Sequence, residues 1–239
     1  MIKVLELGKS YGSTVALKNI SFEIGTGEIV GILGQNGAGK TTLMRILTTY
    51  LQPSSGKVMI NERDVTRSSL EIRKGIGYLP ETPPLYMSMR VVDYLKFAAQ
   101  LRNVLPKDQK KRVEQVLNDC DLQEVRNKII GTLSKGYKQR AGIAQAIIND
   151  PAILILDEPT SGLDPVQVQQ IRKLIKNIEK RRTVILSTHI LSEIEQMAQR
   201  VIIIKKGSII KDSSLEEMLK DHSNLEEAFL KTIGFNTNE

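Results

Sequence analysis

The sequence GQNGAGKT, from Gly34 to Thr41, decides the fold of this 239-residue chain. It follows the apolar run EIVGIL and precedes a helix-forming run, and its glycines, lysine and threonine have the spacing of a phosphate-binding loop. In such a loop the backbone N–H groups curve around phosphates, the lysine reaches the terminal ones and the threonine hydroxyl ligates Mg²⁺. A glycine-rich turn that only opens a helix would not need the Lys-Thr pair in register. We therefore predict that nucleotide phosphates contact Gly34, Gln35, Asn36, Gly37, Ala38, Gly39, Lys40, Thr41 and Thr42.

A pair of acids ends a second apolar run, ILILDEP, which places Asp157 and Glu158 at the end of a buried strand. Successive side chains of a strand point in different directions, so the two acids are expected to have different roles. Asp157 suits an outer-shell contact with Mg²⁺, and Glu158 suits a general base that faces the attacking water. A solvated turn is the alternative interpretation of the same pair.

Hydrophobic periodicity predicts the strands around these motifs. Strands with glycine turns extend to about residue 33, and short strands are expected near 57–60 and 76–79. Two buried strands are expected at 153–157 and 184–188, separated by a helix with an apolar face. This alternation of strand and helix predicts a parallel sheet.

A helical insert is expected between the early and the late strands, roughly over residues 85–150. Its three segments with helical periodicity are 89–102, 107–120 and 134–149. A hairpin around KKGS and two short polar helices, roughly 213–239, close the chain. Because no internal repeat is visible, residues 1–239 are expected to form a single nucleotide-binding domain.

Composition limits the classes of function. The hydrophobic content of 41% is ample for a packed core, and the net charge of +7 favours solubility over nucleic-acid binding because aromatic residues are only 4%. The apolar stretches AILIL and VIII are far shorter than the roughly 20 residues of a membrane helix. The amino terminus has no signal-peptide pattern, so a cytoplasmic location is expected. The single cysteine, Cys120, continues an apolar spacing and is expected to be buried and inert.

Three further features have uncertain roles when taken alone. LSKGYKQR carries Ser134 and Gly136 at a predicted helix start, and such starts bind anions. His189, after the strand TVILST, could contact a terminal phosphate, cap a helix or pack in the core. Tyr11, in KSYG, could stack on adenine or belong to the core.

The order and spacing of GQNGAGKT, GYLPE, LSKGYKQR, ILILDEPTSGLDP and STH resemble the nucleotide-binding subunit of ATP-binding cassette (ABC) transporters over nearly the whole chain. This resemblance implies an α/β fold: a P-loop core with a mainly parallel sheet, an amino-terminal antiparallel β subdomain and an α-helical insert that carries the LSKGY signature. It implies that His189 is the switch histidine and that Tyr11 stacks on adenine. It also implies that Ser134 and Gly136 cover the γ-phosphate of ATP held by another subunit.

The chain departs from the family pattern at three positions. Lys135 and Tyr137 replace the first glycine and the glutamine of the usual Leu-Ser-Gly-Gly-Gln signature, and Glu81 stands where glutamine is usual. These variants and the terminal NLEEAFLKTIG are similar to the exporter-type branch of the family. Glu81 is therefore expected to join Thr41 and Asp157 as a ligand of Mg²⁺.

The resemblance implies an ATPase that dimerises around two MgATP. A homodimer is expected, and it is expected to power export through separate membrane-spanning permease subunits. It would then lie on the cytoplasmic face of the cell membrane. A soluble ABC ATPase acting on nucleic acid or ribosomes would have two cassettes or a long coiled coil, and this chain has neither. A P-loop kinase or GTPase would leave LSKGY and SGLD without a role.

The stretch PPLYMSM, from Pro83 to Met89, has two interpretations. Its apolar side chains could pack in the core. Alternatively, they could line a groove that receives a short helix of the membrane partner, a role that suits adaptable methionines. The sequence leaves both open.

Overall fold

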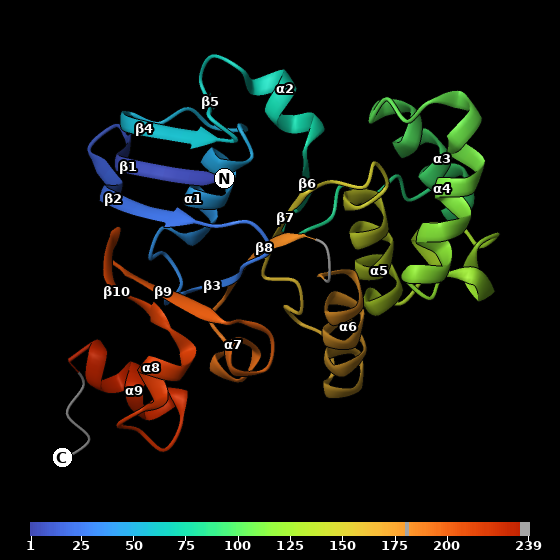
Figure 1. The fold of residues 1–239 in the computed structure, drawn as a ribbon. Helices are drawn as coiled ribbons and strands as arrows, with labels where there is room; N and C mark the ends of the chain where they lie inside the picture. Colours follow the sequence, from blue (N-terminus) through green and yellow to red (C-terminus); the bar gives the residue numbers. More distant parts are fainter. Residues whose placement is uncertain (180–181, 235–239) are drawn as a thin grey trace. The chain divides into compact units, whose positions relative to one another are not determined.

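The computed structural model describes residues 1–179 and 182–234 of the chain. The chain divides into two compact units, each described here by itself. Unit 1 comprises Met1–Ile72 and Thr183–Glu239, and unit 2 comprises Arg73–Arg182. The expected carboxy-terminal extension belongs to unit 1, and its residues 235–239 lie outside the described residues. Figure 1 labels the helices and strands.

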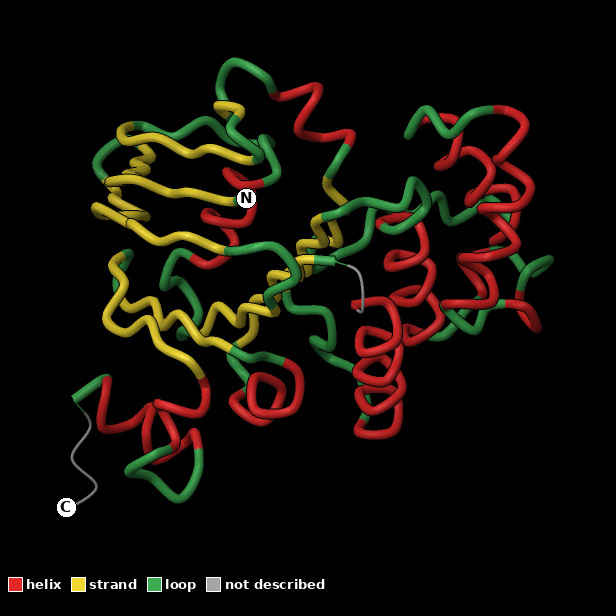
Figure 2. Tube along the Cα trace, viewed as in Figure 1, coloured by secondary structure: helices red, strands yellow, loops and turns green. Residues whose placement is uncertain are grey.

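Unit 1 contains a four-stranded antiparallel sheet in the order β2-β1-β4-β5 (Figures 1 and 2). Its strands are β1 (Ile2–Tyr11), β2 (Thr14–Ile24), β4 (Ser55–Ile60) and β5 (Arg63–Asp64). The alternate residues Ile2, Val4, Val58 and Ile60 are buried, which is the pattern of a sheet with one face on the core. The expected antiparallel β subdomain is thereby confirmed.

A second set of strands in unit 1 is mainly parallel. β3 (Ile29–Leu33) pairs in parallel with β8 (Thr183–Thr188) and with β9 (Arg200–Lys205), and β9 pairs antiparallel with β10 (Ser208–Ser214). Every residue of β3 and β8 is buried, as expected of strands covered on both faces. The KKGS hairpin and the parallel pairing agree with the sequence prediction.

The helices of unit 1 lie at the ends and faces of these strands. They are α1 (Lys40–Leu47), α7 (Leu191–Met197), α8 (Leu215–Leu219) and α9 (Leu225–Thr232). α7 packs closely on β3 because Gly31 has no side chain: a Cβ there would lie 2.3 Å from Ile194 Cδ1. α9 buries Leu225 and Ala228, and the Glu195 carboxylate accepts from Leu225 N at 2.6 Å. The two short terminal helices were expected.

Unit 2 combines a parallel strand pair with four longer helices. β6 (Ile76–Leu79) pairs in parallel with β7 (Ile153–Asp157). The helices are α3 (Val91–Leu101), α4 (Pro106–Asp119), α5 (Lys135–Ala146) and α6 (Pro165–Ile178). Two short 3₁₀ turns, Gln123–Val125 and Ile130–Thr132, lie between α4 and α5. The three expected helical segments are present with ends shifted by one to three residues. The 3₁₀ turns and the short helix α2 (Ser69–Lys74) were not predicted.

The core of unit 2 explains its helix pattern. α5 is buried on nearly every side, since Gly136 and all residues from Gln139 to Ala144 are buried. α4 instead buries one stripe, Val113, Val116 and Leu117, and Cys120 continues it with no exposure. Burial raises the pKa of the Cys120 thiol, so the group stays protonated and inert as predicted.

Within residues 1–179 and 182–234, no helix has both the length and the apolar character needed to cross a membrane. This agrees with the short apolar runs of the sequence.

Candidate nucleotide-binding and hydrolysis site

The predicted phosphate-binding loop joins β3 to α1 in unit 1. Gly37 and Gly39 have φ values of 77° and 109°, a left-handed backbone that glycine adopts at little cost. The Lys40 side chain is 5% exposed and folds back over the loop, where Nζ donates to Gly34 O at 2.8 Å and to Gln35 O at 3.3 Å. An ammonium held by the carbonyl groups of its own loop stands at the position where terminal phosphates would compete for it.

The loop is fixed by close backbone approach on two sides. A Cβ at Gly34 would lie 2.5 Å from Ile204 O, and a Cβ at Gly39 would lie 2.7 Å from Ala16 O. Gly207 N, in the turn between β9 and β10, donates to Ala38 O at 3.0 Å. The loop is therefore held in shape by neighbouring strands before any ligand binds, which lowers the cost of binding.

The start of α1 is open to an anion. Gly39 is the N-cap residue of α1 and makes no side-chain cap hydrogen bond. Its first turn, with Thr41 and Thr42, therefore presents backbone N–H groups and the positive end of the helix dipole. The same arrangement binds phosphates in P-loop proteins.

His189 and Tyr11 also belong to unit 1. The parallel register pairs Leu33 with Thr188, so His189 and Gly34 follow neighbouring strand ends. His189 is exposed, whereas Thr188 is buried and donates its hydroxyl to Glu193 at 2.7 Å. Tyr11 is 46% exposed, with Lys9 Nζ 5.3 Å from its ring centroid. The two side chains are thus at the surface, and their roles toward phosphate and adenine remain predictions.

The acid pair ends β7 in unit 2. Asp157 is 1% exposed and Glu158 is 7% exposed. Glu158 has a φ of 49°, a left-handed conformation that is uncommon for a residue with a side chain. Such strain persists only where the surroundings impose it, and it is found preferentially at functional sites. The turn that follows is closed by Ser161 N, which donates to Glu158 O at 3.1 Å.

Glu81 is brought to the same strand edge by the register of unit 2. Leu79 pairs with Leu156, so the residues that follow β6 and β7 emerge side by side at the carboxyl ends of parallel strands. Glu81 is exposed in the loop after β6, whereas Asp157 is buried at the end of β7. The expectation that these acids share one region is consistent with this register.

The signature helix α5 begins at Ser134, whose side chain caps it by accepting from Tyr137 N at 3.5 Å. Gly136 faces Gln167 so closely that a Cβ would lie 3.0 Å from its amide carbon. Lys135 Nζ lies against Gly162 of the SGLD segment and leaves no room for a Cβ there. The signature is therefore packed directly on the segments that follow Glu158.

Two side-chain hydrogen bonds that fix α5 to other segments were not predicted from the sequence. Gln139 Nε2 donates to Pro159 O at 2.7 Å in a buried hydrogen bond, which ties α5 to the turn beside Glu158. The Tyr137 hydroxyl donates to the Glu124 carboxylate in the first 3₁₀ turn. The spacing of α5 could have indicated an inward-facing Gln139, but nothing in the sequence pairs either residue with its partner.

The donor chemistry fits a magnesium ion. The predicted ligands Thr41, Glu81 and Asp157 carry a hydroxyl and two carboxylates, and hard oxygen ligands are those that Mg²⁺ prefers. No group of three His, Cys, Asp or Glu side chains in the described parts of the chain is arranged to hold a metal by itself.

A rigid loop with a buried lysine at an uncapped helix start, together with an acid pair after a buried strand, defines a nucleotide-hydrolysing P-loop protein. The family described as "ABC transporter" matches residues 17–161. The chain is 37% identical over 236 residues to the lantibiotic transport ATP-binding protein SrtF of Streptococcus pyogenes, covering 98% of both chains. It is 37% identical over 222 residues to the bacitracin transport ATP-binding protein BcrA of Bacillus licheniformis, covering 92% of this chain and 72% of that protein.

Solved structures give the same answer. An ATP-binding subunit of an ABC transporter superposes with a TM-score of 0.87 at 26% identity, covering 98% of this chain and 99% of the other. A dimeric ATP-binding cassette in a post-hydrolysis state with ADP and phosphate superposes at 0.82 with 27% identity, covering 90% and 99%. The chain belongs to the ABC transporter family and is an ATP-binding subunit with ATPase activity.

Proposed function

We propose that two copies of this subunit enclose two MgATP molecules and that closure and hydrolysis drive export through separate membrane-spanning subunits. The observation that carries the proposal is the presence of two helix starts with phosphate-binding character in one chain: the open start of α1, and Ser134 with Gly136 at α5. Each ATP would be contacted by both kinds of helix start, α1 of the copy that binds it and α5 of the second copy. The dimeric solved relative bound to ADP and phosphate supports this arrangement.

Each predicted site residue has a separate role in the proposed reaction. Lys40 and the N–H groups of α1 hold the β- and γ-phosphates, and Tyr11 stacks on the adenine. Glu158 accepts the proton of the attacking water, while His189 donates a hydrogen bond to the γ-phosphate. Mg²⁺, bound through Thr41, Asp157 and Glu81, would neutralise the charge that develops on the phosphate oxygens.

The second subunit completes electrostatic stabilisation. A P-loop contacts the phosphates from one side only, so the γ-phosphate would stay open to water, where electrostatic interactions are weak. Ser134 and Gly136 of a second copy would cover it, exclude water and make ATP part of the dimer interface. Hydrolysis then removes the contact that holds the interface together, which makes the dimer a mechanical switch.

Export and a place at the cytoplasmic face of the membrane rest on similarity to the antibiotic-transport subunits BcrA and SrtF. A surface for the membrane partner is available in unit 2. Tyr86 and Met87 are 54% and 50% exposed, and the Tyr86 ring contacts Phe97 edge to face at 5.4 Å between centroids. An aromatic that is held on one face and exposed on the other suits a docking loop better than a core.

The function is tested by Glu158→Gln. The amide cannot accept the proton, so hydrolysis should slow by roughly 10² to 10⁴ fold while ATP binding persists. A stable dimer should then appear on size exclusion with MgATP at concentrations where the unaltered chain is a monomer. Glu62→Gln is the matched control because Glu62 is exposed and has a similar left-handed φ of 65°. Undiminished turnover in Glu158→Gln would remove this residue from the role.

The docking surface is tested by Tyr86→Asp. A buried carboxylate at a docking site is costly, so this variant should lose recovery of the membrane subunits from detergent-solubilised membranes. Its ATP binding should stay unchanged. Ile210→Asp, on a partly exposed residue of β10, controls for a general effect of added charge. Loss of folding in Tyr86→Asp would instead favour a core role for the loop.

A further inference from the structure

A basic hollow of about 650 Å³ lies within unit 2, away from the residues assigned to ATP. Four segments form it: the end of α2, the turn between α3 and α4, the first half of α4, and the turn between α5 and β7. Its lining residues include four cations, Lys74, Arg102, Lys111 and Arg112. The volume falls in the range of specific ligand sites, roughly 300 to 1,000 Å³.

The cations of this basic hollow outnumber its acids. Only Asp108 and Asp150 among the described lining residues are acidic, and Asp150 is shared with two arginines: Arg182 lies 2.6 Å from its Oδ1 and Arg112 lies 3.7 Å from it. Lys74 and Lys111 are exposed, and neither ammonium is paired with a carboxylate in the described part of the chain. The hollow therefore has a surplus of positive charge that faces solvent.

Arg102 adds to this surplus without being neutralised. Its guanidinium donates to two carbonyl oxygens, Arg73 O at 3.2 Å and Ile76 O at 3.4 Å. Burial lowers the pKa of Arg102, and Tyr94 partly offsets this effect. A guanidinium remains charged despite such a shift, so Arg102 contributes a positive charge to the hollow.

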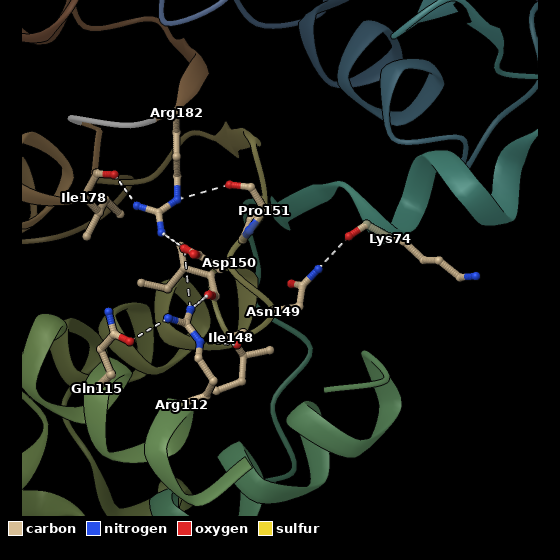
Figure 3. Close-up of polar contacts among 10 residues, drawn as sticks. Lys74, Arg112, Gln115, Ile148, Asn149, Asp150, Pro151, Ile178 and Arg182 are labelled. Carbon is tan, nitrogen blue, oxygen red and sulfur yellow. Dashed lines mark hydrogen bonds and ion pairs between the residues drawn. The ribbon is translucent and has the colours of Figure 1, made fainter. Parts of the chain in front are cut away.

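The wall of the basic hollow is already ordered (Figure 3). Arg112 Nε donates to Ile148 O at 3.0 Å, and one of its terminal nitrogens donates to Ile147 O at 2.8 Å. Asn149 Nδ2 donates to Lys74 O at 2.8 Å, which joins the end of α2 to the turn after α5. A ligand would therefore meet fixed cations at small ordering cost.

Three kinds of anion could occupy a surface of this charge, and the lining favours one. A flat bilayer surface cannot follow a concave site formed by four segments. Single-stranded nucleic acid would require aromatic stacking platforms, and none of the described lining residues is aromatic. A polypeptide with several carboxylates can reach cations that stand on different segments and can leave its backbone solvated.

We propose that the basic hollow binds an acidic polypeptide segment of a partner protein. It lies at the carboxyl end of α3, where Arg102 follows the helix, whereas Tyr86 packs near the amino end of α3 through Tyr94. The lining residues of the hollow include neither Tyr86 nor any residue assigned to ATP.

The proposal is tested with a fluorescein-labelled deca-glutamate peptide and the full chain at about 50 mM salt, where surface charges are weakly screened. Lys74→Glu/Lys111→Glu should weaken binding by roughly tenfold or more in fluorescence anisotropy, because two attractive charges become repulsive. The control Lys57→Glu/Lys173→Glu changes net charge equally at two exposed lysines outside the hollow and should shift affinity less than about twofold.

Equal losses in the two double variants, or no binding by the unaltered chain, would overturn the proposal. Vesicles of phosphatidylserine in phosphatidylcholine and an oligo-thymidine single strand are tested with the same variants. If either of these probes, and not deca-glutamate, loses affinity only in Lys74→Glu/Lys111→Glu, the polypeptide assignment is wrong. ATP hydrolysis and the thermal midpoint should be unchanged in both variants, which shows that each still folds.

Discussion

The helices α1 and α5 both begin with phosphate-binding character, yet they are built differently. α1 starts at a left-handed glycine with no side-chain cap, after a loop that is held by neighbouring strands. α5 starts at Ser134, whose hydroxyl accepts a long 3.5 Å hydrogen bond from Tyr137 N. The first start is open to a ligand at once, whereas the second already has a weak internal partner.

The two helices also differ at their carboxyl ends. In α1 the last-turn Arg45 is exposed and stacks over Tyr50, 5.9 Å from its ring centroid. The carbonyl groups that follow α5 receive two hydrogen bonds from Arg112, which is 15% exposed. The carboxyl end of α1 is instead closed by the turn that follows it, where Tyr50 N and Leu51 N donate to Arg45 O at 2.8 and 3.0 Å. This contrast is consistent with the proposal that α1 binds the nucleotide of its own chain and that α5 contacts the nucleotide of a second copy.

The largest expected effect distinguishes nucleotide binding through Lys40 from coverage of the γ-phosphate by Ser134. Ser134→Arg should abolish dimer-dependent hydrolysis, a loss of roughly 10² fold or more, because a bulky cation occupies the place of the γ-phosphate contact. It should leave nucleotide binding by the monomer nearly intact. Lys40→Ala should instead weaken that binding by roughly 10² fold, the value of a lost charge-assisted contact. Calorimetric titration with MgATP and a phosphate-release assay measure both quantities.

A mixture of the two variants sharpens this comparison. Each lacks a different half of the composite site, so a mixed dimer should recover at most one competent site. If Ser134→Arg weakened ATP binding by the isolated monomer as much as Lys40→Ala does, α5 would belong to the same nucleotide as α1, and the arrangement between two copies would be wrong.

The next effect concerns the clamped end of α5. Arg112→Ala should lower the free energy of unfolding by about 1 to 3 kcal/mol, since it removes the side-chain donor of Ile148 O and leaves Ile147 O with Asp150 N alone. Arg45→Ala, at the end of α1, should cost less than about 1 kcal/mol because its stacking is exposed. Urea denaturation of both variants measures this difference, and equal midpoints would remove the contrast between the two helix ends.

A smaller effect is expected at Glu81, the acid beside β7. A carboxylate attracts Mg²⁺ but repels metal-free ATP, whereas an amide does neither to the same degree. Glu81→Gln should therefore bind metal-free ATP roughly tenfold better and show a shallower dependence of ATP affinity on Mg²⁺. Titrations with and without EDTA decide the matter. Identical Mg²⁺ dependence would place Glu81 outside the metal shell and leave coupling to the membrane partner as its role.

The smallest effect concerns how much the Ser134 cap contributes to the stability of α5. Ser134→Ala should cost only a few tenths of a kcal/mol in stability, because its hydrogen bond is long. Asp164→Ala at the start of α6 should cost about 1 kcal/mol, since that cap accepts from Gln167 N at 2.9 Å. Thermal melts of the two variants compare the caps. A larger loss for Ser134→Ala would show that its hydroxyl is committed to its own helix.

The sequence by itself determined the parts of this protein that depend on local spacing. The glycine pattern and Lys40 predicted the phosphate-binding loop, because glycine adopts the left-handed backbone of Gly37 and Gly39 at little cost. Apolar runs predicted the parallel strands, and helical periodicity predicted α3, α4 and α5. The buried position of Cys120 followed from the same periodicity.

Only the tertiary structure decided the contacts between segments that are distant in the chain. The pairing of Leu79 with Leu156 brings Glu81 toward Asp157, and the buried bond from Gln139 to Pro159 joins α5 to the turn after Glu158. The basic hollow collects cations from three segments that are distant in the chain: the end of α2, the turn after α3, and α4. Periodicity states which face of an element is buried but not which other element covers it, since that choice depends on packing and register across the whole unit.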